Sequence, residues 1–409
     1  MLLFKDRIET KLSFTYQQLF NFLNSTEPVI INFKQKQTSL YLFNFIKAIC
    51  NQIDLTLLDL DFTNEEVLNL TQKNYEPIVI QKQFIEIQNI EDLKTHLQNS
   101  KSILSIFTSG TTGQPKVVEH TVQNLIRNTK IGPKYQGNCW GLAYNPTHIA
   151  GVQVLFQALL NGCSLINLFE ATRNEVYDSI KLNGITHISA TPTFFRLLLP
   201  FEQQCENIQN ISIGGEKSSE ILIENLKKIF PFARINNIYA STEAGSLFAS
   251  HGVGFKIPNS KKEYIKIEKN EIYVHQTLLG NSKELQNETW FSTGDLIEWI
   301  NEEEGYFKII SRKNELLNIG GNKVNPAEVE QCLEAIDGIK EAYVYGRPNS
   351  VLGTILCCDI CCEENISELD IKQQLKEKLQ PFKIPRKFYF KTAMEVTRNG
   401  KIKRDKNVA

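Results

Sequence analysis

The chain has 409 residues, 42% of them hydrophobic and 22% charged, and its 45 basic and 46 acidic residues give a formal charge of −1. This length predicts two or more domains, the composition is that of a soluble globular protein, and the neutral balance gives no support to nucleic-acid binding. We expect a cytoplasmic protein without a membrane span, because the charged start at Met1–Arg7 is unlike a signal peptide and no stretch approaches ~18 consecutive apolar residues.

In the first 250 residues, apolar runs that end at turn residues alternate with segments of helical periodicity. The predicted strands are Ser102–Phe107, Ile185–Ala190, Ile211–Ile213 and Ile235–Tyr239. The predicted helices are Tyr16–Leu23, Leu40–Gln52, Val122–Thr129, Val152–Leu160 and Glu220–Ile229. Strands that alternate with crossover helices predict α/β layers around a largely parallel sheet.

The second part of the chain has a different pattern. Short alternating strands, Tyr264–Ile267 and Glu271–His275, indicate a small β-rich part. A strand, a turn, a helix, two strands, a helix and a strand then follow. The clearest of these are the helices Pro326–Ala335 and Ile366–Leu379 and the strands Lys340–Tyr345 and Thr354–Cys362. We predict a large N-terminal α/β domain, 1–312, and a small mobile α+β domain, 313–409, joined by a tight hinge.

Four of the nine cysteines gather in the run Cys357-Cys358-Asp359-Ile360-Cys361-Cys362. A zinc site normally needs a second pair of ligands at a defined distance, and no histidine follows this run. The apolar residues before it favour a buried strand in which cysteine is a small hydrophobic side chain. We therefore predict a strand with reduced thiols rather than a metal site.

A polar loop lies between the predicted strand Ser102–Phe107 and the predicted helix Val122–Thr129. Its glycines let backbone amides face an anion, its hydroxyls add donors, and its lysine supplies positive charge, as a polyphosphate-binding loop requires. The Walker A pattern does not fit, because Pro115 stands five residues after Gly110. The candidate ligands are Thr108, Ser109, Gly110, Thr111, Thr112, Gly113 and Lys116.

The loop resembles the signature of the acyl-adenylate-forming (AMP-binding) superfamily, in the branch of 4-coumarate–CoA and o-succinylbenzoate–CoA ligases. Four further segments resemble motifs of that family in the expected order: Tyr239–Glu243, Ser292–Asp295, Ser311–Glu330 and Thr397–Arg404. Before residue 100 the resemblance thins, and the N-terminal domain looks shortened at its start.

The resemblance implies an acid–thiol ligase that uses ATP, Mg²⁺ and CoA. An acid and ATP would form acyl-AMP and pyrophosphate, and a thiol would then displace AMP. Lys401 would bridge the carboxylate and the α-phosphate as a mobile positive charge. Glu243 would bind Mg²⁺, which prefers carboxylates and phosphate oxygens, and Thr242 would contact the α-phosphate.

The resemblance also assigns binding roles. Tyr239 would stack on adenine, Asp295 would bind the ribose hydroxyls, and Arg312 would contact ribose or phosphate. The remaining implied positions are Ala240 and Ser241 in the motif of Tyr239, Gly214, Gly215 and Glu216 at the adenine, His148 at the acyl pocket, Gly320 and Gly321 in the pantetheine tunnel, and Asn314 at the hinge. His187 is expected to be a core residue of a strand.

Two positions depart from the family pattern. Ala240 replaces the usual glycine, and Asn314 stands where Asp or Lys is usual, although asparagine tolerates unusual backbone angles. The segment Gly141–Gly151 contains no aspartate to hold an α-amino group, which disfavours an amino acid as substrate. Besides a CoA ligase for an acyl or aromatic acid, two alternatives stay open. They are an enzyme that loads the phosphopantetheine of an acyl carrier protein, and a degenerate member that binds nucleotide without catalysis.

Overall fold

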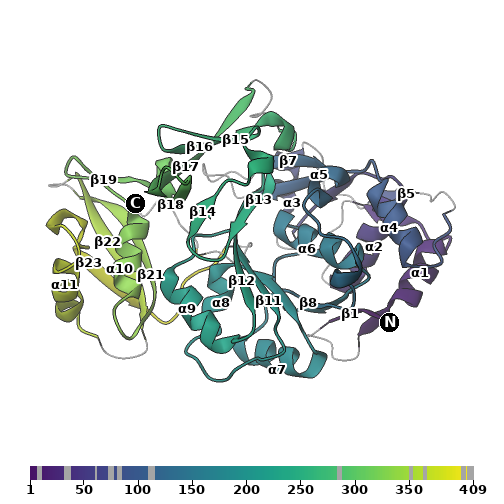
Figure 1. The fold of residues 1–409 in the computed structure, drawn as a ribbon, viewed down its shortest axis with the longest axis horizontal. Coiled ribbons are helices and arrows are strands. Elements are labelled where there is room, and N and C mark those ends of the chain that lie inside the picture. Colours follow the sequence, from purple (N-terminus) through teal and green to yellow (C-terminus); the bar gives the residue numbers. More distant parts are fainter. Residues whose placement is uncertain are drawn as a thin grey trace.

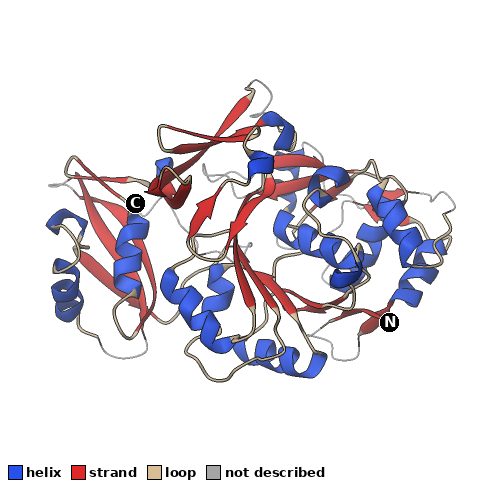
Figure 2. Cartoon of the chain, in the orientation of Figure 1, coloured by secondary structure: helices blue, strands red, loops and turns tan. Residues whose placement is uncertain are grey.

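The computed structural model describes residues 1–6, 12–31, 38–59, 62–71, 78–80, 85–108, 116–282, 288–349, 353–362, 366–397 and 402. Figure 2 shows helices beside the central strands and a smaller group of strands and helices at one end of the molecule. No helix in these ranges is long and apolar enough to cross a membrane.

A sheet of eight described strands forms the centre of the large domain, in the order β13-β12-β11-β10-β8-β9-β1-β2. The strands are β1 (Leu2–Lys5), β2 (Ser13–Thr15), β8 (Cys139–Leu142), β9 (Ser164–Asn167), β10 (His187–Ala190), β11 (Asn210–Gly214), β12 (Arg234–Ser241) and β13 (Gly245–Ser250). All neighbours pair in parallel except at the two ends, where β2 and β13 are antiparallel. The predicted parallel α/β sheet is confirmed.

Helices connect these parallel strands, as right-handed crossover units require. They are α6 (Ile149–Leu159), α7 (Arg173–Asn183), α8 (Pro192–Arg196) and α9 (Glu220–Ile229). The apolar face of α9 is formed by Leu222, Ile223, Leu226 and Ile229, all buried at helical spacing. His187 lies on β10 with its ring 4.8 Å from that of Trp140, and burial lowers its pKa to about 4. The prediction of a core histidine is confirmed.

The N-terminal part adds helices and two small sheets. The helices are α1 (Tyr16–Asn24), α2 (Thr38–Cys50), α3 (Asn64–Thr71), α4 (Ile90–Gln98) and α5 (Val122–Ile126). One sheet pairs β3 (Val29–Ile31) with β5 (Ile78–Ile80), and the other has the order β4 (Leu55–Leu57), β6 (Ile103–Thr108), β7 (Lys116–Thr121). Helix α2 is buried almost all round, and this part shares one extensive core with α6, β8 and β9.

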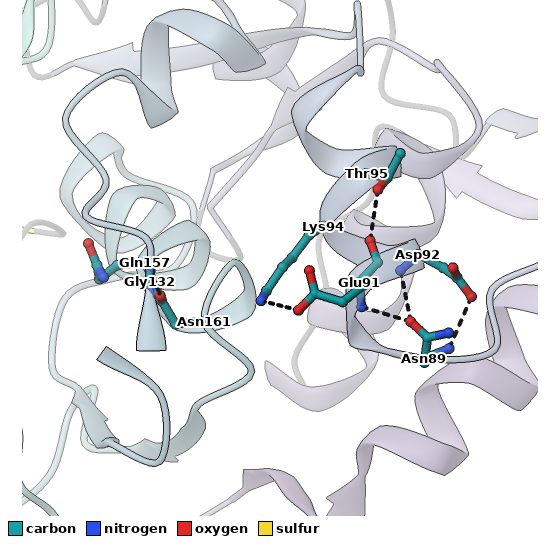
Figure 3. Close-up of polar contacts among 8 residues, drawn as sticks. All are labelled: Asn89, Glu91, Asp92, Lys94, Thr95, Gly132, Gln157 and Asn161. Atoms are coloured by element: carbon teal, nitrogen blue, oxygen red, sulfur yellow. Dashed lines mark hydrogen bonds and ion pairs between the residues drawn. The ribbon is translucent and has the colours of Figure 1, made fainter. Parts of the chain in front are cut away.

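Helix α4 leads into β6, and Figure 3 shows how its first turn is held. The Asn89 side chain accepts hydrogen bonds from the backbone N–H groups of Glu91 and Asp92, at 2.9 and 3.0 Å. The Asp92 carboxylate in turn accepts from the Asn89 N–H, which completes a capping box. Lys94 pairs with Glu91 at 2.6 Å. These local bonds fix the start of a short helix that propensity alone would leave marginal.

The predicted strand before the polar loop and the predicted helix after it are confirmed as β6 and α5. The strand β7, which lies between the loop and α5, was not predicted. It pairs with β6 in antiparallel register from Ile103–Thr121 to Thr108–Lys116. The loop residues 109–115 therefore join two paired strands, and a helix N-terminus does not follow them directly. Their own structure lies outside the described residues.

The second part of the large domain is an antiparallel sheet in the order β14-β18-β17-β16-β15. Its strands are β14 (Gly254–Lys256), β15 (Ile265–Glu268), β16 (Glu271–His275), β17 (Trp290–Asn301) and β18 (Tyr306–Arg312). A cluster of aromatic rings, Phe248, Phe255 and Phe307, packs this sheet against β12 and β13. The predicted β-rich part is confirmed.

The C-terminal domain lies at the far end from the N-terminus (Figure 1). It consists of the hairpin β19 (Leu317–Ile319) and β20 (Asn322–Val324), helices α10 (Pro326–Glu334) and α11 (Glu368–Lys376), and the sheet β21 (Ile339–Asn349), β22 (Gly353–Cys362), β23 (Lys387–Lys391). From α10 onward this is the predicted order of elements, and before α10 a two-stranded hairpin stands where one strand and a turn were predicted. The cysteine run lies on β22, with Cys357, Cys358 and Cys361 buried, and burial raises the pKa of Cys361 to about 11. The strand prediction is confirmed.

Candidate active site

Three of the predicted nucleotide-binding residues meet in a buried polar cluster. Asp295, on β17, is 5% exposed and accepts a 2.6 Å hydrogen bond from the Tyr239 hydroxyl and a 3.0 Å bond from Arg312 Nε. Tyr239 lies near the end of β12, and Arg312 ends β18. The Asp295 carboxylate therefore links the parallel sheet to the antiparallel one.

Burial and the Asp295 carboxylate determine the protonation of the groups in this cluster. Burial, together with the charge of Asp295, raises the pKa of Tyr239 well above its ordinary value, so the hydroxyl stays a donor. Burial alone would lower the pKa of Arg312, but Asp295 outweighs it and raises that pKa. The Tyr239 ring packs on Phe248 with centroids 4.7 Å apart. Stacking of adenine on the other face of the Tyr239 ring stays a prediction.

The turn Thr242–Ala244 between β12 and β13 carries the predicted metal ligand. Each of its three carbonyl oxygens accepts a hydrogen bond: Thr242 from His120 at 2.7 Å, Glu243 from the Gly280 N–H at 2.7 Å, and Ala244 from Arg127. No described residue forms a hydrogen bond or an ion pair with the Glu243 carboxylate. The backbone of the turn is held while this carboxylate stays available to a ligand.

Two of these three contacts come from the chain that follows the polar loop. His120 lies on β7 and Arg127 just after α5, so the segment that follows the loop also holds the Thr242–Ala244 turn. Burial is the largest influence on His120 and lowers its pKa, so the ring is neutral. Its Nε2 then donates to Thr242, and its Nδ1 accepts from the Asn124 amide at 3.3 Å.

Sequence analysis did not identify His120, Arg127 or Gly280. A Cβ on Gly280 would lie only 2.6 Å from His120 Cε1 and 2.8 Å from the Glu119 carbonyl oxygen. The glycine is needed because another strand segment approaches here, where Glu119 and Asn281 exchange backbone hydrogen bonds of 2.8 Å. A sequence signal for His120 and Arg127 was available, because polar residues recur between them at spacings of four and three, as on one face of a helix.

The segment Gly214-Gly215-Glu216 begins with the last residue of β11, at the carboxyl edge of the parallel sheet, where ligands of open α/β sheets bind. Gly215 has φ +88°, which favours glycine. The Glu216 Oε2 atom accepts from the backbone N–H of Thr193 at 3.1 Å and from its hydroxyl at 2.7 Å. The Oε1 atom accepts from the backbone N–H of Ile402 at 3.1 Å. Glu216 thus joins the large domain to the C-terminal segment.

His148 is the N-cap residue of α6, and its Nε2 lies 3.1 Å from Asp59 Oδ2. Asp59 is 4% exposed and also accepts from the Asn145 amide at 2.9 Å and from the Thr147 hydroxyl. Burial would raise the pKa of Asp59, but the hydrogen bonds and the charge of His148 lower it. Sequence analysis did not foresee Asp59, which orients the predicted acyl-pocket histidine.

The predicted hinge and the glycine pair lie where the C-terminal domain begins. Asn314 is exposed within a short 3₁₀ turn, Lys313–Glu315. Gly320 and Gly321 have φ of +57° and +87° and form the tip of the β19–β20 hairpin, with open space around both. Two positive φ values are typical of a tight two-residue hairpin turn.

Other predicted residues are not brought together by described contacts. Lys116 begins β7, paired with the backbone of Thr108, and Ala240 and Ser241 end β12. Lys401 and the loop residues Ser109, Gly110, Thr111, Thr112 and Gly113 lie outside the described residues. Lys401 directly precedes Ile402, whose backbone N–H binds the Glu216 carboxylate.

Two family models match this chain. The model of AMP-binding enzymes matches residues 13–275, and the model of the AMP-binding enzyme C-terminal domain matches residues 328–401. The 2-succinylbenzoate–CoA ligase of Staphylococcus epidermidis is 24% identical over 98% of this chain and 93% of its own length. The Staphylococcus aureus ligase of the same name is 29% identical over 78% of this chain and 68% of its own length.

Solved structures share the fold. The o-succinylbenzoate–CoA synthetase (MenE) of Bacillus subtilis, in complex with its acyl-adenylate intermediate, has a TM-score of 0.70 at 20% identity, over 98% of this chain and 94% of that one. ATP-bound MatB from Rhodopseudomonas palustris has a TM-score of 0.76 at 16% identity, with the same two coverages. The predicted two-part α/β and α+β architecture is confirmed.

Proposed function

This chain belongs to the family of AMP-binding enzymes, and we propose that it is an acid–CoA ligase whose acid is 2-succinylbenzoate. The ligase activity follows from the family and from relatives that cover nearly the whole chain. The choice of acid is supported by the names of those relatives and by the absence of an aspartate in the segment Gly141–Gly151. The observation that carries the proposal is the cluster of Tyr239, Asp295 and Arg312 beside the Thr242–Glu243 turn.

The cluster suits the ribose of ATP. Each carboxylate oxygen of Asp295 already accepts one hydrogen bond, and each retains a lone pair for a ribose hydroxyl. Arg312 stays charged and is half-exposed, so it can also reach a phosphate oxygen. Because three elements hold these groups, they are oriented before ATP binds, which lowers the entropic cost of positioning it.

In the first step, a carboxylate oxygen of the acid attacks the α-phosphorus, and the bond to pyrophosphate breaks. Two anions approach each other, so catalysis depends on positive charge at the α-phosphate. We assign that charge to Lys401, with the Thr242 hydroxyl as a further contact. The polar loop from Thr108 to Lys116 would bind the β- and γ-phosphates.

The site also fits Mg²⁺. The Glu243 carboxylate has no described partner, and its backbone carbonyl is held by Gly280. One or two carboxylates with phosphate oxygens are the usual protein ligands of this ion. When bound, Mg²⁺ neutralises charge on the phosphates, and Glu243 would hold it.

In the second step, a thiolate attacks the acyl carbonyl, the thioester forms, and AMP leaves with the electron pair of the broken C–O bond. We assign His148 to the acyl pocket, and the glycine tip Gly320–Gly321 to the pantetheine tunnel after rotation at Asn314. The open space around both glycines supports close approach of a narrow ligand arm.

The test is a reaction with ATP, Mg²⁺ and 2-succinylbenzoate, with and without CoA, in which AMP, pyrophosphate and the thioester are quantified by mass spectrometry. We expect AMP and 2-succinylbenzoyl-CoA in equal amounts, and little turnover with benzoate or an amino acid. If a thioester formed only with a holo acyl carrier protein, that protein would replace CoA as the proposed acceptor. ATP binding without AMP formation from any acid would refute the proposal in favour of a nucleotide-binding member without catalysis.

A further inference from the structure

We propose that Glu216 is a positioning residue that docks the segment carrying Lys401 onto the large domain during adenylation. This role deepens the proposed function and rests on it. Glu216 was expected to belong to the adenine-binding segment, but both of its carboxylate oxygens bind protein donors. The backbone of Gly214 and Gly215 is left to meet the base, while the Glu216 side chain points elsewhere.

The carboxylate joins Thr193 to Ile402, which lies 186 residues after Glu216 in the chain. On one side, the N–H and the hydroxyl of Thr193 fix Oε2, at 3.1 and 2.7 Å. On the other side, Oε1 accepts the Ile402 N–H at 3.1 Å. Hydrogen bonds from backbone N–H groups to a carboxylate are charge-assisted and stronger than neutral ones. Thr193 therefore orients the carboxylate, and the carboxylate holds the residue next to Lys401.

Ile402 has a second contact beside its hydrogen bond to Glu216. It forms an antiparallel bridge with Val396, so the same residue is linked both to the preceding part of the C-terminal domain and to the Glu216 carboxylate. The Glu216 carboxylate binds the backbone N–H of Ile402. Replacing the Lys401 side chain therefore leaves the contact in place, which separates the docking role from the charge of the lysine.

A second contact between helix α8, which carries Thr193, and the C-terminal domain also supports docking. Arg196, three residues after Thr193 on α8, pairs with Glu334 of α10 at 3.5 Å, and the two side chains are only 13% and 11% exposed. Burial raises the pKa of the Glu334 carboxyl to about 7, and the positive charge of Arg196 opposes this rise. Helix α8 thus orients Glu216 with one residue and contacts the C-terminal domain with another.

The consequence is specific to one half-reaction. Ile402 and Glu216 belong to different domains, so any rotation at the hinge that brings the glycine hairpin to the site must break their hydrogen bond. Glu216 can therefore promote adenylation, whereas thiolation of an acyl-adenylate already formed does not need it. A residue that merely supports folding would affect both.

The experiment compares the two half-reactions in Glu216→Ala, Glu216→Gln, Lys401→Ala and the double variant Glu216→Ala/Lys401→Ala. Glu224→Gln, at an exposed position of α9, is the matched control. Adenylation is measured as pyrophosphate release from ATP and 2-succinylbenzoate. Thiolation is measured with supplied acyl-adenylate and CoA, and ATP affinity by calorimetry.

We expect Glu216→Ala to slow adenylation about 10- to 100-fold, the effect of a lost hydrogen bond to a charged group. Glu216→Gln, which keeps one acceptor oxygen, should lose less, and Glu224→Gln nothing. Thiolation and ATP affinity should change less than about threefold, and the double variant should match Lys401→Ala within the same factor, because both changes act through one segment. The proposal would be overturned if the effects of Glu216→Ala and Lys401→Ala multiplied in the double variant. It would also be overturned if Glu216→Ala slowed both half-reactions equally, or if it weakened ATP binding and left the adenylation rate unchanged.

Amide hydrogen exchange of the peptide 396–405 gives a result that does not depend on the reaction. With ATP bound, we expect protection of this peptide in the wild-type chain and faster exchange in Glu216→Ala, with Glu224→Gln unchanged. If the wild-type chain forms no acyl-adenylate, the proposed function fails, while this measurement still tests docking. Identical exchange in the wild-type chain and in Glu216→Ala would overturn the docking role.

Discussion

The substitution Tyr239→Phe isolates the hydroxyl that holds the Asp295 carboxylate. The aromatic ring and its packing on Phe248 remain, and only the 2.6 Å hydrogen bond to Asp295 Oδ2 is lost. Asp295 is 5% exposed, so water does not replace the lost donor fully. A hydrogen bond to a charged group contributes about 1.5 to 3 kcal/mol, and we expect a loss of stability of that size. Arg312 alone would then orient the carboxylate, so we also expect ATP to bind about tenfold more weakly, or ~1.4 kcal/mol.

The matched control is Tyr177→Phe, since the Tyr177 hydroxyl donates at 3.0 Å to the backbone carbonyl of Leu198, a neutral acceptor. This control should cost about 1 kcal/mol of stability and leave ATP affinity unchanged. Chemical denaturation gives the stabilities, and calorimetric titration with ATP and Mg²⁺ gives the affinities. If Tyr239→Phe costs no more than the control and binds ATP equally well, the role of the hydroxyl in orienting Asp295 is refuted.

Three further predictions concern the catalytic charge, a close backbone approach and a buried histidine. Lys401→Ala should lower pyrophosphate release by about 100-fold or more, and unchanged release would contradict its assignment. Gly280→Ala should cost about 1 to 3 kcal/mol of stability, because its Cβ would lie 2.6 Å from His120, whereas the control Gly252→Ala, with open space around it, should cost little. His187, with a pKa lowered by burial from 6.5 to about 4, takes up fewer protons folded than unfolded, so stability decreases as the pH is lowered through this window. Between pH 7.5 and 5 this contribution is about 2 kcal/mol, and the stability of His187→Gln should depend correspondingly less on pH than that of the wild-type chain.

The amino-acid sequence by itself determined the elements that depend on near neighbours. Helix α9 begins and ends at the predicted residues, because its apolar spacing and its N-cap Ser219 are local signals. The cysteine run was identified as a strand from its flanks alone. Ordered motifs likewise indicated the family, since glycines and hydroxyls at fixed spacings record backbone turns that one segment makes by itself.

The tertiary structure decided which residues hold those motifs in place. Strand β7 was missed because it is stabilised mainly by pairing with β6, and such pairing depends on a neighbour more than on intrinsic propensity. Asp59, which orients His148, and His120, which holds the Thr242 carbonyl, act over 89 and 122 residues of sequence. From the sequence, Glu216 was expected in an adenine-binding segment. Only the packing of the two domains brought Ile402 to its carboxylate. A hydrogen bond between distant segments has no local pattern, because the fold alone sets the distance between its donor and its acceptor.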